Sequence, residues 1–195
     1  MAFAILRAEK LKTMGNIGGS LAHNYRSIET PNADPSKTPG NFHSLPNAED
    51  VKNAISERLP DKRRSDAVLC VEYMITASPE WQGWNDDRQN EYFKQAVDWL
   101  EQRHGKHNVV ATSIHRDETT PHLIAYVVPL DQDTGKLNAK KFLGGKAKLA
   151  EMQSSFSNHV KNLGLKRGIE GSKAKHTRIK EYYAKVNEPT PQIRQ

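Results

Sequence analysis

The sequence SIHRDETTPHLIAYVVP, residues 113–129, contains two predicted strands joined by a polar turn. The first, residues 108–115, is rich in Val, Thr and Ile, and the second, residues 122–128, is apolar and β-branched. His115 closes the first strand and His122 opens the second, so antiparallel pairing would bring the two imidazoles close together. Two histidines beside a carboxylate form a ligand set suited to a divalent metal. The alternative interpretation is a surface turn with solvated charges.

The rest of the chain predicts further strands for the same sheet. Residues 67–76 form a continuous apolar run, which is typical of a central strand, and Glu72 interrupts it. A carboxylate in a central strand normally has a partner; a metal-bound histidine would suit it, and an exposed position is the alternative. We predict one antiparallel sheet from the strands at residues 2–10, 66–77, 107–115 and 121–129.

Helical patterns lie between the predicted strands. Asn16 is the expected N-cap of a helix that continues to about Ser27, and Asn47 with Asp50 resembles a capping arrangement for a short helix. Residues 30–46 are rich in Pro, Asn, Ser and Thr and predict a long irregular loop, of the kind that is often functional. Further helices are expected from Asn85 to Gly105, from 146 to 163 and from 173 to 186. The predicted fold class is α+β, a central antiparallel sheet flanked by helices.

The composition indicates one domain with a modest core. The chain has 195 residues, a hydrophobic content of 36% and a mean hydropathy of −0.78. No apolar run approaches the length that spans a bilayer. The apolar stretch at residues 1–6 is too short for a secretory signal before the charged Arg7. The single cysteine, Cys70, excludes an internal disulfide and is interpreted as a small buried hydrophobe. These features predict a protein of a reducing cytoplasm.

The charge of the chain is positive and unevenly distributed. The net charge is +6 and the sequence pI is about 9.3. Between residues 136 and 180, only Glu151 and Glu170 oppose the many lysines and arginines. This asymmetry predicts a polyanionic partner, most often a nucleic acid. The alternative is a solvated basic face without a partner.

Three ordered motifs resemble those of one protein family. GNIGGSLAHNYR, residues 15–26, resembles the N-terminal motif of the Mob/Pre plasmid mobilisation relaxases, often called MOBV. DPSKTPGN, residues 34–41, resembles the second motif, and HRDETTPH, residues 115–122, matches the third motif, H-x-D-E-x-T-P-H-x-H, up to its final position. Residues 167–176 resemble the family's downstream basic segment. The resemblance covers essentially the whole chain.

The resemblance implies a fold of the HUH endonuclease type and a DNA-nicking activity. Such a relaxase cleaves one strand at a plasmid origin of transfer and stays covalently attached to the 5′ end. In this family the attacking group is thought to be the histidine that matches His23 rather than a tyrosine. His23 and Arg26, on one predicted helix face, would then serve as nucleophile and phosphate clamp. Without the resemblance, the ordinary interpretation of His23 is a surface histidine.

The same resemblance, with the residues themselves, gives the expected metal site. His115, His122 and Glu118 are the expected ligands of a divalent metal, Mn²⁺ or Mg²⁺. Glu118 is also a candidate catalytic residue, because it could instead take the nucleophile's proton, and the sequence leaves both roles open. The chain departs from the family pattern at Ile124, where the third motif ends in histidine, and at Phe42, where the second motif commonly has tyrosine.

The expected partner is plasmid origin-of-transfer DNA, single-stranded or locally melted, and conjugative coupling machinery is a further expected partner. Because family members are usually longer, we interpret residues 1–195 as a single catalytic domain, the N-terminal part of a longer protein. The alternatives are a rolling-circle replication initiator, which shares the HUH architecture, and a non-catalytic origin-binding module. Basic residues are expected to line a groove that leads to the metal site. The expected DNA-contacting residues are Lys140, Lys141, Lys146, Lys173, Lys175 and Arg178.

Overall fold

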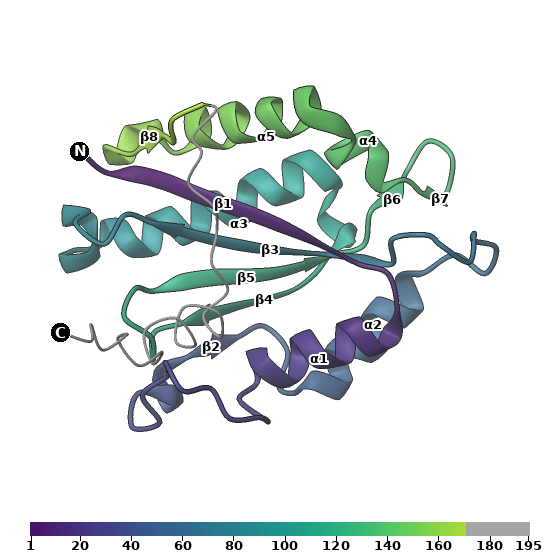
Figure 1. Ribbon diagram of the computed structural model, residues 1–195, viewed down its shortest axis with the longest axis horizontal. Coiled ribbons are helices and arrows are strands. Elements are labelled where there is room, and N and C mark those ends of the chain that lie inside the picture. Colours follow the sequence, from purple (N-terminus) through teal and green to yellow (C-terminus); the bar gives the residue numbers. More distant parts are fainter. Residues whose placement is uncertain (171–195) are drawn as a thin grey trace, which may run out of the picture.

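The computed structural model describes residues 1–170 and shows a twisted six-stranded sheet (Figure 1). Neighbouring strands are antiparallel, except that β1 and β8 are parallel. The four strands expected from the sequence therefore share one antiparallel sheet, whereas the helix expected at residues 173–186 lies outside the described residues. In spatial order the strands are β2 (Phe42–His43), β4 (Val109–His115), β5 (His122–Val127), β3 (Cys70–Ala77), β1 (Phe3–Leu11) and β8 (Lys166–Arg167).

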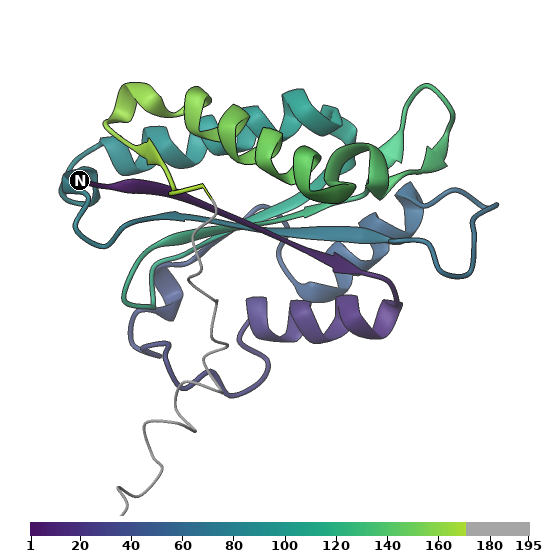
Figure 2. The same cartoon turned by 45° about the horizontal axis from the view of Figure 1, so that its top comes forward.

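Helices cover both faces of this sheet, in two layers that are clearest in Figure 2. One layer holds α1 (Met14–Asn24) and α2 (Ala48–Arg58), and the other holds α3 (Arg88–His104), α4 (Ala139–Leu143) and α5 (Gly145–His159). A separate hairpin is formed by β6 (Leu130–Asp131) and β7 (Lys136–Leu137). Single 3-10 turns are η1 (Thr38–Gly40), η2 (Gln82–Asn85), η3 (Lys106–Asn108) and η4 (Lys161–Leu163). The helix predicted at residues 146–163 is thus divided into α5 and η4.

Side chains along each strand alternate between the two helical layers. Tyr73 and Leu123 are fully buried in the apolar cluster beneath α3 and α5. Ile124 and Tyr126 belong to the cluster beneath α1 and α2. Because successive side chains of a strand point to opposite faces, His122 faces the α1 side, like Ile124 two residues further on. The sheet therefore presents the predicted ligand residues toward α1.

The structure moves some helix ends from their expected positions. The N-cap of α1 is Thr13 rather than Asn16, because the Thr13 hydroxyl accepts a hydrogen bond of 3.0 Å from the N–H of Asn16. The N-cap of α2 is Asn47, as expected, and its side chain accepts from the N–H of Asp50 at 2.8 Å. Gly105, with a φ of 92°, ends α3 as expected.

The C-terminus of α1 has an unusual backbone. The helix ends at Asn24 and not at Ser27, because Arg26 has a φ of 55° and turns the chain away. The N–H of Ser27 bonds to the carbonyl of Ala22 at 2.8 Å and that of Arg26 to the carbonyl of His23 at 3.2 Å, which is a Schellman motif. Glycine usually occupies this left-handed position, and another residue there costs about 1 kcal/mol or more. The side chain of Arg26 must therefore make compensating contacts.

Cys70 lies at the start of β3 and is completely buried, as the sequence suggested. Burial raises the pKa of its thiol well above the usual range. Among the described residues, no helix is both long enough and apolar enough to cross a membrane.

Candidate metal and nucleophile site

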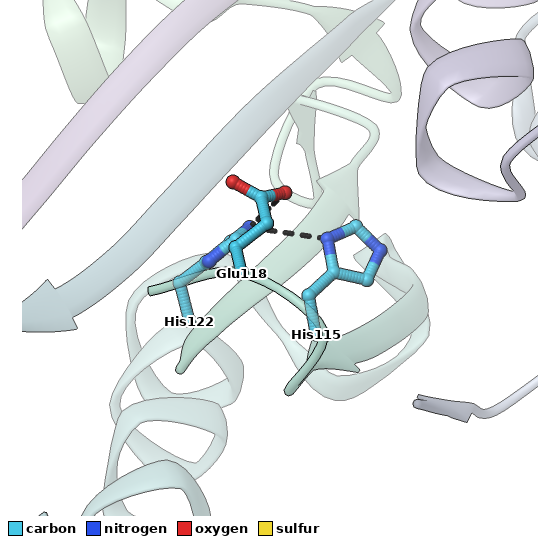
Figure 3. Close-up of side chains that lie close together, drawn as sticks. All are labelled: His115, Glu118 and His122. Atoms are coloured by element: carbon cyan, nitrogen blue, oxygen red, sulfur yellow. Dashed lines mark hydrogen bonds and ion pairs between the residues drawn. The ribbon is translucent and has the colours of Figure 1, made fainter. Parts of the chain in front are cut away.

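The core of the site is a pair of facing histidines. His115 ends β4 and His122 begins β5, and they are direct partners in the antiparallel register. Their Nδ1 and Nε2 atoms, respectively, lie 3.1 Å apart, with the rings at 87° to each other (Figure 3). The expectation that the strands would bring the two imidazoles together on one face is confirmed.

Hydrogen bonds of the two rings fix which nitrogens carry protons. His115 Nε2 lies 2.9 Å from the carbonyl oxygen of Asn24, and His122 Nδ1 lies 3.2 Å from that of Thr120. A carbonyl group only accepts, so each of these nitrogens carries a proton, and a ring that holds no second proton keeps a lone pair on its other nitrogen. The two facing nitrogens are then both lone-pair acceptors at 3.1 Å. Such an arrangement is repulsive unless a cation binds both.

A divalent metal fits this arrangement better than a proton. Burial, followed by the neighbouring His122, lowers the pKa of His115 to about 3, which disfavours a bridging proton near neutral pH. Two metal–nitrogen bonds of about 2.1 Å at a right angle would place the nitrogens about 3.0 Å apart. The observed separation of 3.1 Å is close to this value, so both nitrogens lie near enough to bind one ion.

Glu118 completes a three-residue group that could hold a metal ion. One potential ligand atom from each of His115, Glu118 and His122 lies within 4.8 Å of the others (Figure 3). Glu118 Oε1 is 3.7 Å from His122 Nε2. Both carboxylate oxygens are oriented by donors, Oε1 by Arg26 at 2.7 Å and Oε2 by Asn32 at 2.6 Å. Two imidazoles and one carboxylate form a mixed nitrogen–oxygen ligand set.

Arg26 is bound to carboxylates and not left free in solvent. Its guanidinium makes a bidentate contact with Asp117, at 3.0 and 2.8 Å, and donates to Glu118 and to the carbonyl of His23. The Asp117 side chain is fully buried, and although burial opposes it, Arg26 holds the pKa of this carboxyl far below its usual range. These contacts offset the left-handed backbone of Arg26 and direct its charge toward Glu118, a candidate metal ligand.

His23 lies on the exposed side of the last turn of α1. The charges of the site act on its imidazole. The pKa of His23 is lowered first by desolvation and next by the charge of Arg26, and the charges of Glu118 and Asp117 oppose this shift. The ring is therefore neutral near pH 7, with a lone pair available. His23 and Arg26 do not share a helix face as expected, since Arg26 follows the helix end, yet both reach the same site.

His43 is a site residue that the sequence interpretation missed. It lies in β2, where Nδ1 is 2.7 Å from the hydroxyl of Ser113, and its ring centroid is 6.0 Å from that of His115. The ring also stacks on Tyr25 at 4.3 Å, and burial lowers its pKa. A histidine within the long polar loop at residues 30–46 was the available signal, because such loops often carry function.

Glu72 is not the partner of a metal-bound histidine. Its carboxylate accepts a hydrogen bond of 2.8 Å from the hydroxyl of Ser20 on α1, and the same hydroxyl lies 2.8 Å from that of Tyr126. Burial raises the pKa of Glu72. The hypothesis of a histidine partner was wrong, because the helix packed on this face supplies a nearer donor.

Ile124 lies on the same face of β5 as His122, as expected. Ile124 is 7% exposed and packs in the apolar cluster beneath α1, so at this position the chain provides core packing in place of a ligand. The expected basic groove that leads to the metal site stays a prediction. Lys140 lines a cleft at the opposite end of the sheet, Lys141 is paired with Asp131 at 2.8 Å, and Lys146 is exposed in the first turn of α5. Lys173, Lys175 and Arg178 lie outside the described residues.

The fold is similar to that of relaxase domains. The MobM relaxase domain bound to plasmid pMV158 origin-of-transfer DNA, in a Mn-bound crystal structure, matches with a TM-score of 0.79 and 29% sequence identity. The match covers 94% of this chain and 99% of that domain. A second Mn-bound structure of the same domain, with 3′-thiophosphate DNA, gives the same TM-score, identity and coverage.

The sequence places the chain in one family. A family model described as plasmid recombination enzyme, Mob_Pre, matches residues 1–184, so the chain belongs to this family. A 65 kDa protein of Zymomonas mobilis is 38% identical over 192 residues, which is 95% of this chain and 33% of that protein. The plasmid recombination enzyme type 3 of Staphylococcus aureus is 32% identical, over 95% of this chain and 48% of that enzyme. The chain thus spans between a third and half of these relatives' length.

Proposed function

We propose that this chain acts as a plasmid mobilisation relaxase. It would nick one strand of origin-of-transfer DNA by metal-assisted transesterification and rejoin that strand. The observation that carries the proposal is the 3.1 Å approach of the facing ring nitrogens of His115 and His122, with Glu118 in the same group and the charges of the site acting on the pKa of the exposed His23. The similarity to a relaxase domain bound to DNA and Mn supports it. The setting would be the cytoplasm, where plasmid DNA resides, with conjugative coupling machinery as a further partner.

His115, His122 and Glu118 would hold a divalent metal, Mn²⁺ or Mg²⁺. A metal bound there supplies Lewis-acid stabilisation of the charge that develops on the non-bridging oxygens of the scissile phosphate. The protein's part is to present two imidazoles and one oriented carboxylate. Both Glu118 oxygens already accept hydrogen bonds from Arg26 and Asn32, which favours the ligand role over that of proton acceptor.

His23 would be the nucleophile. Its imidazole nitrogen attacks phosphorus, a phosphorus–nitrogen bond forms, and the bond from phosphorus to the 3′ oxygen breaks. The 3′ oxygen takes a proton from solvent and leaves as a hydroxyl, while the other ring nitrogen of His23 releases its proton to solvent. Attack by that hydroxyl reverses the reaction and rejoins the strand. The lowered pKa of His23 keeps the imidazole neutral and therefore nucleophilic near pH 7.

Arg26 would act chiefly as a positioning residue. Four of its five N–H donors are engaged by Asp117, Glu118 and the carbonyl of His23, so one donor remains for a phosphate oxygen. Through these bonds Arg26 fixes a metal ligand and the end of the helix that carries the nucleophile. Arg26, expected from the sequence to be a phosphate clamp, would thus mainly hold protein groups in place and would offer only one donor to the phosphate.

The test is capture of a covalent protein–DNA adduct. The parent protein, with Mn²⁺ and a labelled oligonucleotide from its plasmid's origin of transfer, should yield a denaturation-resistant adduct with the 5′ fragment end. His23→Ala should abolish the adduct and leave DNA binding largely intact. Tyr25→Phe is the matched control, because the Tyr25 hydroxyl is already bonded to the carbonyl of Leu45 at 2.8 Å. DNA binding without any adduct would instead indicate a binding module, and loss only in Tyr25→Phe would contradict the nucleophile.

A further inference from the structure

Asn24 is the last residue of α1 and directly follows His23, the proposed nucleophile. The two neighbours have opposite surroundings, because His23 is exposed whereas Asn24 is only 2% exposed. Successive side chains of an α-helix point about 100° apart, and α1 lies against one face of the sheet (Figure 2). The chain therefore places a buried polar side chain immediately beside the residue that would attack the DNA.

The backbone carbonyl of Asn24 accepts a hydrogen bond of 2.9 Å from Nε2 of His115. The last four carbonyls of an α-helix have no partner within the helix. Those of Ala22 and His23 are bonded by the turn that follows the helix, whereas that of Asn24 is bonded by a candidate metal ligand. Histidines that bind metals usually donate their other N–H to such an acceptor, which fixes the orientation of the ring.

The side chain of Asn24 binds the same strand at a second point. Its Nδ2 donates a hydrogen bond of 3.1 Å to the hydroxyl of Ser113. Ser113 precedes His115 by two residues on β4, so the two side chains point to the same face of the sheet. The Ser113 hydroxyl is also 2.7 Å from Nδ1 of His43 on β2. The end of α1 is thus held to β4 by one backbone bond and one side-chain bond of the same residue.

The other atom of the Asn24 carboxamide has an unfavourable environment. Its Oδ1 is buried and has no hydrogen-bond partner in the part of the chain that the structure describes. An unpaired polar atom in the interior lowers the stability of a fold, and such an atom in a native protein calls for a functional explanation. An apolar side chain would avoid this cost. Stability alone therefore does not account for an asparagine at this position.

We propose that Asn24 is a positioning residue that aligns the nucleophile His23 with the metal ligand His115. The proposal rests on the nicking function proposed above. The carbonyl of Asn24 orients the imidazole of His115, and its side chain fixes the place of the helix end on β4. In the reaction, His23 attacks a phosphorus atom whose oxygens face the metal, and a displacement of about 1 Å between reacting groups can lower a rate by about 100-fold.

Asn24 and Arg26 hold the same helix end from different sides. Arg26 bonds the carbonyl of His23 and the carboxylate of Glu118, and Asn24 bonds β4 from the buried side of α1. Loss of the Asn24 side chain leaves the bonds of Arg26 in place. Its removal should therefore weaken metal binding and slow the reaction without abolishing either.

The test breaks the side-chain bond from each end. Asn24→Ala and Ser113→Ala both remove it, and neither removes a candidate metal ligand or the nucleophile. The matched control is Ser20→Ala, because Ser20 lies one turn earlier on α1 and its hydroxyl also bonds the sheet, at Glu72 over 2.8 Å. Titration calorimetry without DNA gives the Kd for Mn²⁺. A single-turnover assay at saturating Mn²⁺ gives the rate of adduct formation on an origin oligonucleotide.

Asn24→Ala and Ser113→Ala should each raise the Kd for Mn²⁺ by about 10-fold. The double variant should show no further rise, because both changes break the same bond. At saturating Mn²⁺ the rate should stay about 10-fold or more below that of the parent, since a bound metal does not restore the place of His23. Ser20→Ala should keep the parental Kd and rate.

Three results would overturn the proposal. They are an unchanged Kd in Asn24→Ala, equal losses in Ser20→Ala, and full recovery of the rate of Asn24→Ala at saturating Mn²⁺. Urea unfolding without metal shows whether each variant is folded. If Asn24→Ala does not fold, Ser113→Ala carries the same test with Asn24 in place.

The two readouts also separate this proposal from the nicking function. If the parent forms no adduct, the nicking function fails, and the Kd values then decide whether Asn24 positions the metal ligand. If the parent forms the adduct and Asn24→Ala matches it in Kd and rate, the nicking function stands and the role of Asn24 is overturned.

Discussion

The two ends of the sheet treat charge in opposite ways. At the metal end, Asp117 and Glu118 both accept hydrogen bonds from Arg26, so the charges are paired before any substrate arrives. At the other end, a cleft between the end of β1, residues 62–68, β7 and α4 is lined by Lys12, Lys62 and further cations, and neither of these two lysines forms an ion pair within 4.0 Å among the described residues. In the proposed function the reacting groups are held in place in advance, whereas unpaired positive charge at the other end attracts polyanions.

The largest expected effect is a loss of stability when the ion pairs of Arg26 at the metal end are removed. Arg26→Ala leaves the fully buried carboxylate of Asp117 without its cation, and such losses cost about 3 kcal/mol at the lower end of the usual range, because Arg26 keeps 10% exposure. Urea unfolding of the parent and variant measures the loss. The matched control at the other end is Arg64→Ala, which breaks an exposed pair with Asp66 and should change stability little. Equal losses at both ends would remove the contrast.

Metal binding should stabilise the fold only through the group of His115, Glu118 and His122. Mn²⁺ at a hundredfold excess over its Kd should stabilise the fold by about 2.7 kcal/mol, seen as a rise in Tm. His122→Ala should lose this shift, and His107→Ala, which removes an exposed histidine far from the ligands, should keep it. Persistence of the full shift in His122→Ala would show that the ion binds elsewhere.

His104 is a buried histidine that belongs to neither the candidate metal group nor the cleft lining, and it should make the free energy of unfolding depend on pH. Burial, followed by the charge of Arg103, lowers the pKa of His104 to about 3, against about 6.5 in the unfolded chain. As pH falls, the unfolded state takes up the proton first, so the stability contribution is full above pH 6.5 and is lost between about 6.5 and 3.

Between pH 7 and pH 5 this loss amounts to about 2 kcal/mol. His104→Gln should remove that part of the pH dependence, because the amide does not titrate and can still bond the Tyr73 hydroxyl, which lies 2.7 Å from the ring. Free energies of unfolding at the two pH values give the answer. A pH dependence that is the same in parent and variant would contradict the assignment.

The smallest expected effect concerns the helix that connects the two ends. Thr13→Ala removes the N-cap of α1 beside the cleft and should cost about 1 kcal/mol. Asn47→Ala removes the cap of α2 and should cost a similar amount. If α1 is the rigid link between the ends, only Thr13→Ala should also slow adduct formation by His23, which a single-turnover assay would show.

The sequence predicted the parts of the fold that depend on regular alternation. The pairing of His115 with His122 followed from the apolar pattern of their strands, since one register buries the right faces. The grouping of His115, Glu118 and His122 followed from the same pattern, because a two-strand corner brings neighbours in sequence together. Their role as metal ligands stays a prediction.

What could not be predicted depends on tertiary contacts. Nothing local distinguishes Arg26 as a left-handed residue, because its conformation is held by carboxylates about 90 positions away. His43 reaches the site through a strand of two residues, which is too short to give a pattern. The cleft gathers Lys12 and Lys62 from segments that the chain brings together only on folding. In each case the cause lies in contacts distant in sequence.

Because Cys70 is buried, its reaction with a thiol reagent would report the opening of the core around β3. A thiol reagent reacts with the thiolate, and Cys70 offers neither access nor ionisation while β3 is covered. Because the sequence contains no other cysteine, any label acquired by the unmodified chain records an opening of this strand. In a Lys62→Cys variant the new, exposed thiol would react rapidly, whereas Cys70 would react only when β3 opens. One molecule would then report both the reactivity of the surface and the opening rate of the core.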